Sequence, residues 1–174
     1  YEGGIRVPFF IRYPARLKAG TTYDQVVSGM DLYPTFVALA DGQLPEGVAF
    51  DGVDIMPYLT GEKSGPPHPV HFWRLGGNAA VRKGDLKMVV RGPATKELYD
   101  LARDPGEKQD VSADFPEEVA EMTRLLADWD AQMPPPGWNR AKDRAWMEQY
   151  MKEHGIVLPA PKGNKAKRQN RTNR

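Results

Sequence analysis

An uninterrupted apolar stretch near the start of the chain constrains the fold more than any other feature. Residues 5–13 read Ile-Arg-Val-Pro-Phe-Phe-Ile-Arg-Tyr and lie between Gly4 and Pro14. The run Val7–Ile11 does not alternate apolar and polar residues, which is typical of a strand buried on both faces in a parallel sheet. Pro8 lacks an amide donor, so we place it near the beginning of the strand or at a local irregularity.

Such a strand needs neighbours on both sides, and the later sequence contains no strand–helix alternation that would supply parallel partners. The chain also enters a motif at once, Tyr1-Glu2-Gly3-Gly4, without a lead-in. We therefore expect the 174 residues to be a segment of a longer polypeptide.

Two short helices are predicted before residue 64. Asp31 is a candidate N-cap, Pro34 falls in the first turn and Gly42 can close the first helix. The residues expected on its buried side are Met30, Phe36, Val37 and Ala40. The stretch 51–61 then predicts a turn and a short helix that ends at Gly61.

Strands are predicted after a linker at residues 64–68, which we take as the main domain boundary. The stretch 71–75 is the first strand, and a hairpin follows with its turn at Gly84-Asp85. The arms of this hairpin are 79–83 and 86–91, and 97–101 is a further short strand.

A long amphipathic helix is predicted over 115–133. Asp114 is the expected N-cap, Glu117 completes a capping box and Pro116 sits in the first turn. Apolar residues recur at steps of three or four, so this helix should cover one face of the antiparallel sheet. They are Val119, Met122, Leu126, Trp129 and Met133.

Charge is distributed unevenly along the chain. Six of the 24 basic residues lie in 162–174, so 18 basic residues oppose 23 acidic ones in the remainder. We expect 134–161 to be a helical extension, with a helix at about 140–154, and 162–174 to be a disordered basic tail. The mildly acidic remainder does not favour nucleic acid as a partner. No apolar run approaches the roughly 20 residues that span a bilayer, so no membrane partner is expected either.

Five stretches in order resemble the sulfatase family over roughly residues 1 to 133. The stretch 1–8 resembles the segment that follows an active-site lysine in that family. The stretch 27–36 resembles the next helix, 51–61 the turn that closes the larger domain, and 80–88 with 97–107 the small C-terminal sheet and the loop beyond it.

The resemblance implies an α/β fold of the alkaline-phosphatase type, of which this chain is the C-terminal portion. Residues 1–64 would end the large α/β domain, and 65–133 would form a small antiparallel sheet packed against a helix. It also implies hydrolysis of a sulfate monoester by a formylglycine nucleophile beside calcium, and a periplasmic or secreted location. A divalent cation and fixed lysines are suited to this reaction because charge develops on the peripheral oxygens of sulfate.

The segment lacks the family's reactive groups. It contains no Cys/Ser-x-Pro-x-Arg motif, and without cysteine it lacks the usual formylglycine precursor. We therefore assign no catalytic and no metal residue here, and we expect calcium and formylglycine in the parent enzyme rather than in this segment. The aspartates at 51, 54, 100, 104 and 110 are interpreted as cap and turn residues.

The small sheet supplies our candidates for the substrate cleft, because the resemblance places this subdomain beside it. They are His71, Trp73, Arg74 and Asn78. Trp73 would stack on a sugar or aryl ring, and Arg74 would pair with a second anionic group. An ordinary half-buried strand with a surface arginine is the alternative interpretation. Tyr1 and Glu2 are expected near the family's active-site lysine as scaffold.

Three functions remain open on the sequence. The first is a sulfatase segment that is inactive alone, with the preceding part of the polypeptide as its partner and a sulfated small molecule or glycan as substrate. The second is a phosphatase or phosphonate hydrolase of the same superfamily. The third is a separate module that binds sulfated glycans through Trp73 and Arg74.

Overall fold

The computed structural model describes residues 1–75, 77–92 and 95–133, which belong to one unit of the chain. The expected extension at 134–161, its helix at 140–154 and the basic tail at 162–174 lie outside the described residues. The boundary expected between 64 and 65 stays a prediction.

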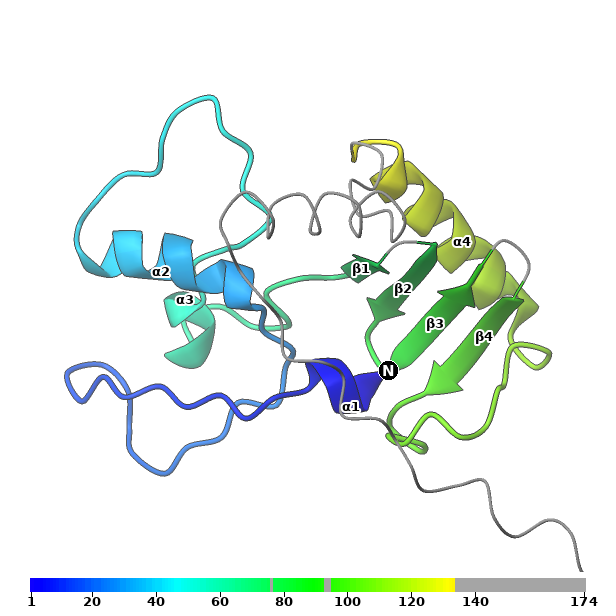
Figure 1. Cartoon of the computed structure of the whole chain (residues 1–174). Helices are drawn as coiled ribbons and strands as arrows, with labels where there is room; N and C mark the ends of the chain where they lie inside the picture. Colours follow the sequence, from blue (N-terminus) through cyan, green and yellow to red (C-terminus); the bar gives the residue numbers. More distant parts are fainter. Residues whose placement is uncertain (76, 93–94, 134–174) are drawn as a thin grey trace, which may run out of the picture. The chain divides into compact units, whose positions relative to one another are not determined.

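The strands of this unit form a four-stranded antiparallel sheet in the order β1-β2-β3-β4 (Figure 1). Its strands are β1 His71–Leu75, β2 Asn78–Lys83, β3 Leu86–Arg91 and β4 Thr95–Asp100. Lys83 pairs with Leu86 across the predicted turn, where Gly84 has a φ of 60° that favours glycine. The strands and the hairpin expected from the sequence are therefore confirmed.

Helix α4, Pro116–Asp130, covers one face of the sheet. Met122 is 1% exposed and packs with Val81, Met88 and Leu98, one residue from each of three neighbouring strands. The predicted amphipathic helix and its role in the core are confirmed.

The predicted cap of this helix is wrong. Phe115, not Asp114, occupies the N-cap position, and no side chain caps the helix there. Phe115 packs against the core cluster. Burial of this aromatic ring therefore fixes where the chain enters the helix, and no capping hydrogen bond does so.

The strand predicted over 5–13 is absent. The chain instead forms a short helix α1, Glu2–Ile5, and residues 6–13 have no regular structure. Val7 is 72% exposed and Phe10 is 91% exposed. Because a strand is held by hydrogen bonds to neighbours, and the one described sheet consists of β1 to β4, this apolar stretch has no ladder to join.

The middle of the chain contains a 3-10 helix η1, Gly29–Asp31, followed by α2, Leu32–Leu39, and α3, Met56–Leu59. The helix ending at Gly61 is confirmed, since α3 ends at Leu59 and Gly61 has a φ of 80°. The Gly42 amide donates to the Val37 carbonyl (2.9 Å), but the left-handed residue that ends α2 is Asp41, with a φ of 52°.

The predicted buried side of α2 is wrong. Met30 and Phe36 are more than half exposed, and the buried residues of α2 are Pro34 and Thr35. The Thr35 hydroxyl accepts a hydrogen bond from the Ile55 amide at 3.1 Å. The helix therefore turns its hydroxyl toward α3, because the buried Ile55 amide needs an acceptor.

Asp31 occupies the N-cap position of α2, as predicted, but its side chain makes no capping hydrogen bond there. Its carboxylate is fully buried and accepts hydrogen bonds from the Ser28 amide at 2.7 Å and the Val53 amide at 2.9 Å. The loop at Val53 approaches closely because Gly52 precedes it; a Cβ at Gly52 would lie 2.0 Å from the Met30 carbonyl oxygen. Asp31 thus connects the segment at Ser28 to the loop at Val53.

Candidate functional site

Charged and aromatic side chains cover the sheet face opposite α4. The strand registers place His71, Arg82, Lys87 and Tyr99 in one row across the sheet. Since side chains alternate along a strand, this row faces away from the row that contacts α4. We describe this polar face as the candidate functional site.

Lys87 is the centre of the site. It is 0% exposed, and its Nζ lies 2.9 Å from Glu2 Oε1 and 2.8 Å from Glu107 Oε1. The same Nζ lies 5.8 Å from the centre of the Trp73 ring. A buried ammonium is costly unless it is paired, and here two carboxylates and one aromatic face surround it.

Arg82 completes the charge balance. Its Nη1 lies 3.3 Å from Glu2 Oε2, and the Glu107 carboxylate also accepts a hydrogen bond from the Glu2 backbone amide. Two carboxylates therefore oppose two cations. We call Glu2, Arg82, Lys87 and Glu107 the ionic cluster.

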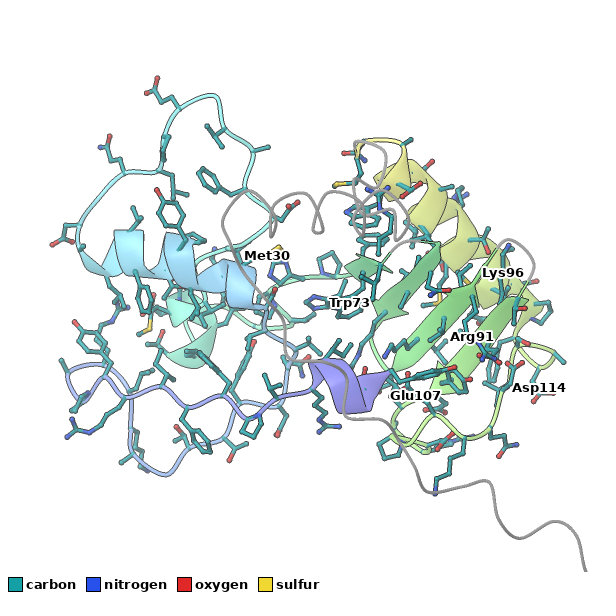
Figure 2. The ribbon with its side chains drawn as sticks, viewed as in Figure 1. Met30, Trp73, Arg91, Lys96, Glu107 and Asp114 are labelled. Carbon is teal, nitrogen blue, oxygen red and sulfur yellow. The ribbon has the colours of Figure 1, made fainter. Side chains whose placement is uncertain are left out.

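The loop that supplies Glu107 has its own internal support. Glu107 has a left-handed backbone with a φ of 51°. The Asp104 carboxylate accepts hydrogen bonds from the amides of Gln109 at 2.8 Å and Lys108 at 2.6 Å, and these bonds lower the pKa of Asp104. The interpretation of Asp104 as a turn residue is thus confirmed. Figure 2 labels Glu107 in this loop and Trp73 on β1.

A tyrosine pair extends the polar face beside the ionic cluster. The rings of Tyr1 and Tyr99 meet edge to face with their centres 6.3 Å apart, and both hydroxyls donate to Glu97. Burial, followed by the hydrogen bond to Glu97, raises the pKa of Tyr99. Tyr1 and Glu2 are therefore held against the sheet by neighbouring groups.

A second polar cluster lies at β1 and the segment before it. His68 Nε2 is 2.6 Å from the Asp31 carboxylate, and the rings of His68 and His71 are 5.1 Å apart. His71 also stacks on Trp73. The buried Nε2 of His71 has no hydrogen-bond partner among the described residues. Burial lowers the pKa of His71, and the charges of His68 and Arg82 lower it further.

The structure brings together some of the residues predicted for the cleft. His71 and Trp73 share the polar face, and the register places Asn78 on it as well, where its side chain accepts a bond from the Gly92 amide at 3.3 Å. Arg74 lies on the opposite face, paired with Asp130 and 5.9 Å from the Trp129 ring. Trp73 and Arg74 therefore do not converge on one ligand.

Sequence analysis missed Lys87, Arg82 and Glu107. A usable signal exists for Lys87, because it sits inside the otherwise apolar run 86–90. A charge within a central strand predicts a buried partner. Nothing local in the sequence identifies Glu107 as that partner, since it lies 20 positions later in a loop.

In the part of the chain that the structure describes, no group of three or more His, Cys, Asp or Glu side chains is placed to hold a metal ion. Among the same residues, no helix is both long and apolar enough to cross a bilayer.

Comparisons with known proteins give a consistent result. The family model described as N-sulphoglucosamine sulphohydrolase, C-terminal, matches residues 1–132. Arylsulfatase A of Bos taurus is 30% identical over 167 residues, which is 76% of this chain and 32% of that protein. N-acetylgalactosamine-6-O-sulfatase of Bacteroides thetaiotaomicron is 31% identical over 141 residues, or 72% of this chain and 27% of that protein.

A solved structure has a similar fold. The crystal structure of Ps i-CgsB aligns with a TM-score of 0.65 at 26% identity, covering 83% of this chain and 33% of that one. This chain therefore spans about a third or less of each protein compared.

Proposed function

Because this chain belongs to the sulfatase family, as a C-terminal segment with the alkaline phosphatase-like fold, we propose that it is part of an enzyme that hydrolyses sulfate monoesters. The observation that supports this most strongly is the family match, which runs through nearly all of the described residues. The expected family and fold class are confirmed.

The reacting groups belong, in this proposal, to the part of the polypeptide that precedes Tyr1. Formylglycine would supply an activated nucleophile, and calcium would stabilise charge on the sulfate oxygens. We assign no reaction step to the described residues. Their role is to bind, support and orient.

The preceding part of the polypeptide is also the proposed partner of residues 7–11. Val7, Phe9 and Phe10 are 72%, 46% and 91% exposed, a concentration of apolar surface that usually marks an interface. An extended stretch with free backbone groups can join the edge of a sheet. We propose that it completes the large α/β domain in this way.

The polar face near β1 supports a contact with substrate. Trp73 offers an aromatic surface for a sugar or aryl ring, and His71 stacks against it. Asn78 lies on the same face. Arg74 would reach a substrate only from the other side of the sheet, so its proposed pairing with an anionic group is supported less well than the role of Trp73.

A separate glycan-binding module fits the structure less well. That hypothesis needs Trp73 and Arg74 to act on one ligand, whereas their side chains lie on opposite faces. No observation of the described residues favours a phosphonate substrate over a sulfate. We further propose a periplasmic or secreted location for the enzyme.

The test is an assay of the longer polypeptide that contains this chain. We expect it to hydrolyse p-nitrophenyl sulfate or a sulfated disaccharide, and to do so faster than it hydrolyses p-nitrophenyl phosphate or a phenylphosphonate ester. The 174-residue chain alone, assayed with calcium, should give no turnover. Preferential hydrolysis of the phosphorus esters, or sulfatase turnover by the isolated chain, would contradict the proposal.

For the cleft, Trp73→Ala in the same polypeptide should raise KM for the sulfated disaccharide. Arg74→Ala is the matched control from the same strand, because its side chain faces α4. An unchanged KM in Trp73→Ala would remove Trp73 from the cleft.

A further inference from the structure

The ionic cluster attaches the first helix to the sheet through charge rather than through apolar contact. Of the first 20 residues, Glu2 alone is buried. The apolar residues of the same segment, from Ile5 to Phe10, are exposed. The position of α1 therefore depends on what holds Glu2.

Three directed contacts hold Glu2. Its carboxylate contacts Lys87 at 2.9 Å and Arg82 at 3.3 Å, and its backbone amide donates to Glu107. Glu107 in turn contacts Lys87 at 2.8 Å. These groups come from α1, β2, β3 and the loop after β4, so one small cluster fixes the relation of four segments that are distant in sequence.

An apolar contact would not fix this relation as closely. Hydrophobic attraction is non-directional, so an apolar side chain at position 2 would bind the sheet without setting the rotation of α1. Charge-assisted hydrogen bonds are short and directional, and a buried polar network can specify one arrangement among several. The side chains of Glu2, Lys87 and Glu107 are only 1% to 6% exposed, so water does not readily replace the contacts among them.

We propose that Lys87 and Glu107 are positioning residues for the reaction, acting through the Glu2 carboxylate and backbone. This inference rests on the proposed function, which assigns the reacting groups to the part of the polypeptide that precedes Tyr1, and on the expectation that the stretch 1–8 follows an active-site lysine. Helix α1 begins at Glu2, so its orientation is transmitted through the backbone to the residues that precede Tyr1. The small sheet would then set the geometry of the reacting groups without touching the substrate.

The experiment uses the longer polypeptide, purified as Lys87→Met and as Glu107→Gln. We expect Lys87→Met to lower kcat about 100-fold for p-nitrophenyl sulfate, the loss associated with a misplacement of about 1 Å, with KM changed less than about threefold. Glu107→Gln keeps the shape of the side chain and should lower kcat by about tenfold. Lys83→Met is the matched control, because Lys83 pairs with Glu121 at 2.6 Å and the two side chains are 48% and 38% exposed.

Hydrogen exchange supplies a readout that is independent of turnover. The Gly4 and Arg6 amides donate to the carbonyls of Tyr1 and Glu2 within α1. Their exchange should accelerate at least about tenfold in Lys87→Met, while the amides of α4 keep wild-type exchange.

The outcomes separate the two proposals. A wild-type polypeptide with no activity on sulfate esters would refute the proposed function, and the exchange of α1 would still decide whether the cluster positions this helix. Wild-type kcat in a folded Lys87→Met protein, or a raised KM with unchanged kcat, would overturn the positioning role. If Lys87→Met does not fold, Glu107→Gln decides by the same criteria.

Discussion

Replacement of Asp31 by asparagine distinguishes two roles for this residue, a simple helix cap and a buried carboxylate with several partners. The two roles predict different changes in the free energy of unfolding. If Asp31 were an ordinary N-cap of α2, asparagine would serve about equally well, and alanine would cost about 0.5–2 kcal/mol. The structure instead gives its carboxylate three partners: the Ser28 amide at 2.7 Å, the Val53 amide at 2.9 Å and His68 Nε2 at 2.6 Å.

The magnitude follows from these contacts. Ser28 donates to Oδ2, whereas Val53 and His68 approach Oδ1. An asparagine has one acceptor oxygen, so at least the Ser28 amide would face an NH₂ group. A buried donor without an acceptor costs about 1–3 kcal/mol, so we expect Asp31→Asn to lose about 2 kcal/mol. Asp31→Ala should lose about 4 kcal/mol, because contacts that share one group are not additive.

The assay is urea unfolding of the 174-residue chain followed by far-UV circular dichroism. Asp54→Ala provides the calibration, since Asp54 accepts one hydrogen bond, from the Met56 amide at 2.9 Å, and should lose only about 1 kcal/mol. Exchange of the Ser28 and Val53 amides should accelerate in Asp31→Asn. If Asp31→Asn is within about 0.5 kcal/mol of wild type, the residue is a simple cap and our reasoning is refuted.

Three further results are expected. Met122→Ala should lose about 2–5 kcal/mol of unfolding free energy in urea, because Met122 is 1% exposed. The control is Arg124→Ala on the exposed side of α4, which should change stability by less than about 0.5 kcal/mol. Equal losses in the two variants would place the core elsewhere. Because the folded pKa of His71 lies below the unfolded value of about 6.5, the folded chain binds fewer protons there. Stability should therefore fall as the pH drops through about 6.5 toward the folded pKa, and the difference in unfolding free energy between wild type and His71→Gln should shrink over that range; a constant difference would contradict this. Phe10→Ser should change the stability of this chain by less than about 0.5 kcal/mol, since Phe10 is 91% exposed. The same substitution should destabilise the longer polypeptide by about 3–5 kcal/mol. A large loss in the isolated chain would show that Phe10 already has a partner within it.

Local patterns predicted the small sheet and its helix. The turn at Gly84-Asp85 sets the register of β2 against β3, and Met122 marks the side of α4 that meets the sheet. Both signals act over a few residues, through a left-handed glycine and through helical periodicity. The sequence therefore carries them without reference to distant partners.

The early apolar stretch shows where a local pattern is insufficient. Val7–Ile11 has the composition of a buried strand, yet a strand exists only when a neighbour supplies hydrogen bonds. The described sheet offers it none, and the stretch has no regular structure. Similarly, Met30 and Phe36 suggest a buried side for α2, but Thr35 faces α3 because the Ile55 amide needs an acceptor.

The sequence by itself determined the positions of the sheet strands, the hairpin at Gly84-Asp85, the apolar face of α4 and the family resemblance, because each depends on neighbouring residues or on short motifs. Only the tertiary structure decided the ionic cluster. Glu2 lies 85 positions before Lys87, and Glu107 lies 20 positions after it, so no local pattern links the three residues. Their pairing arises because a buried ammonium must be neutralised, and folding alone brings the carboxylates within 3 Å of it.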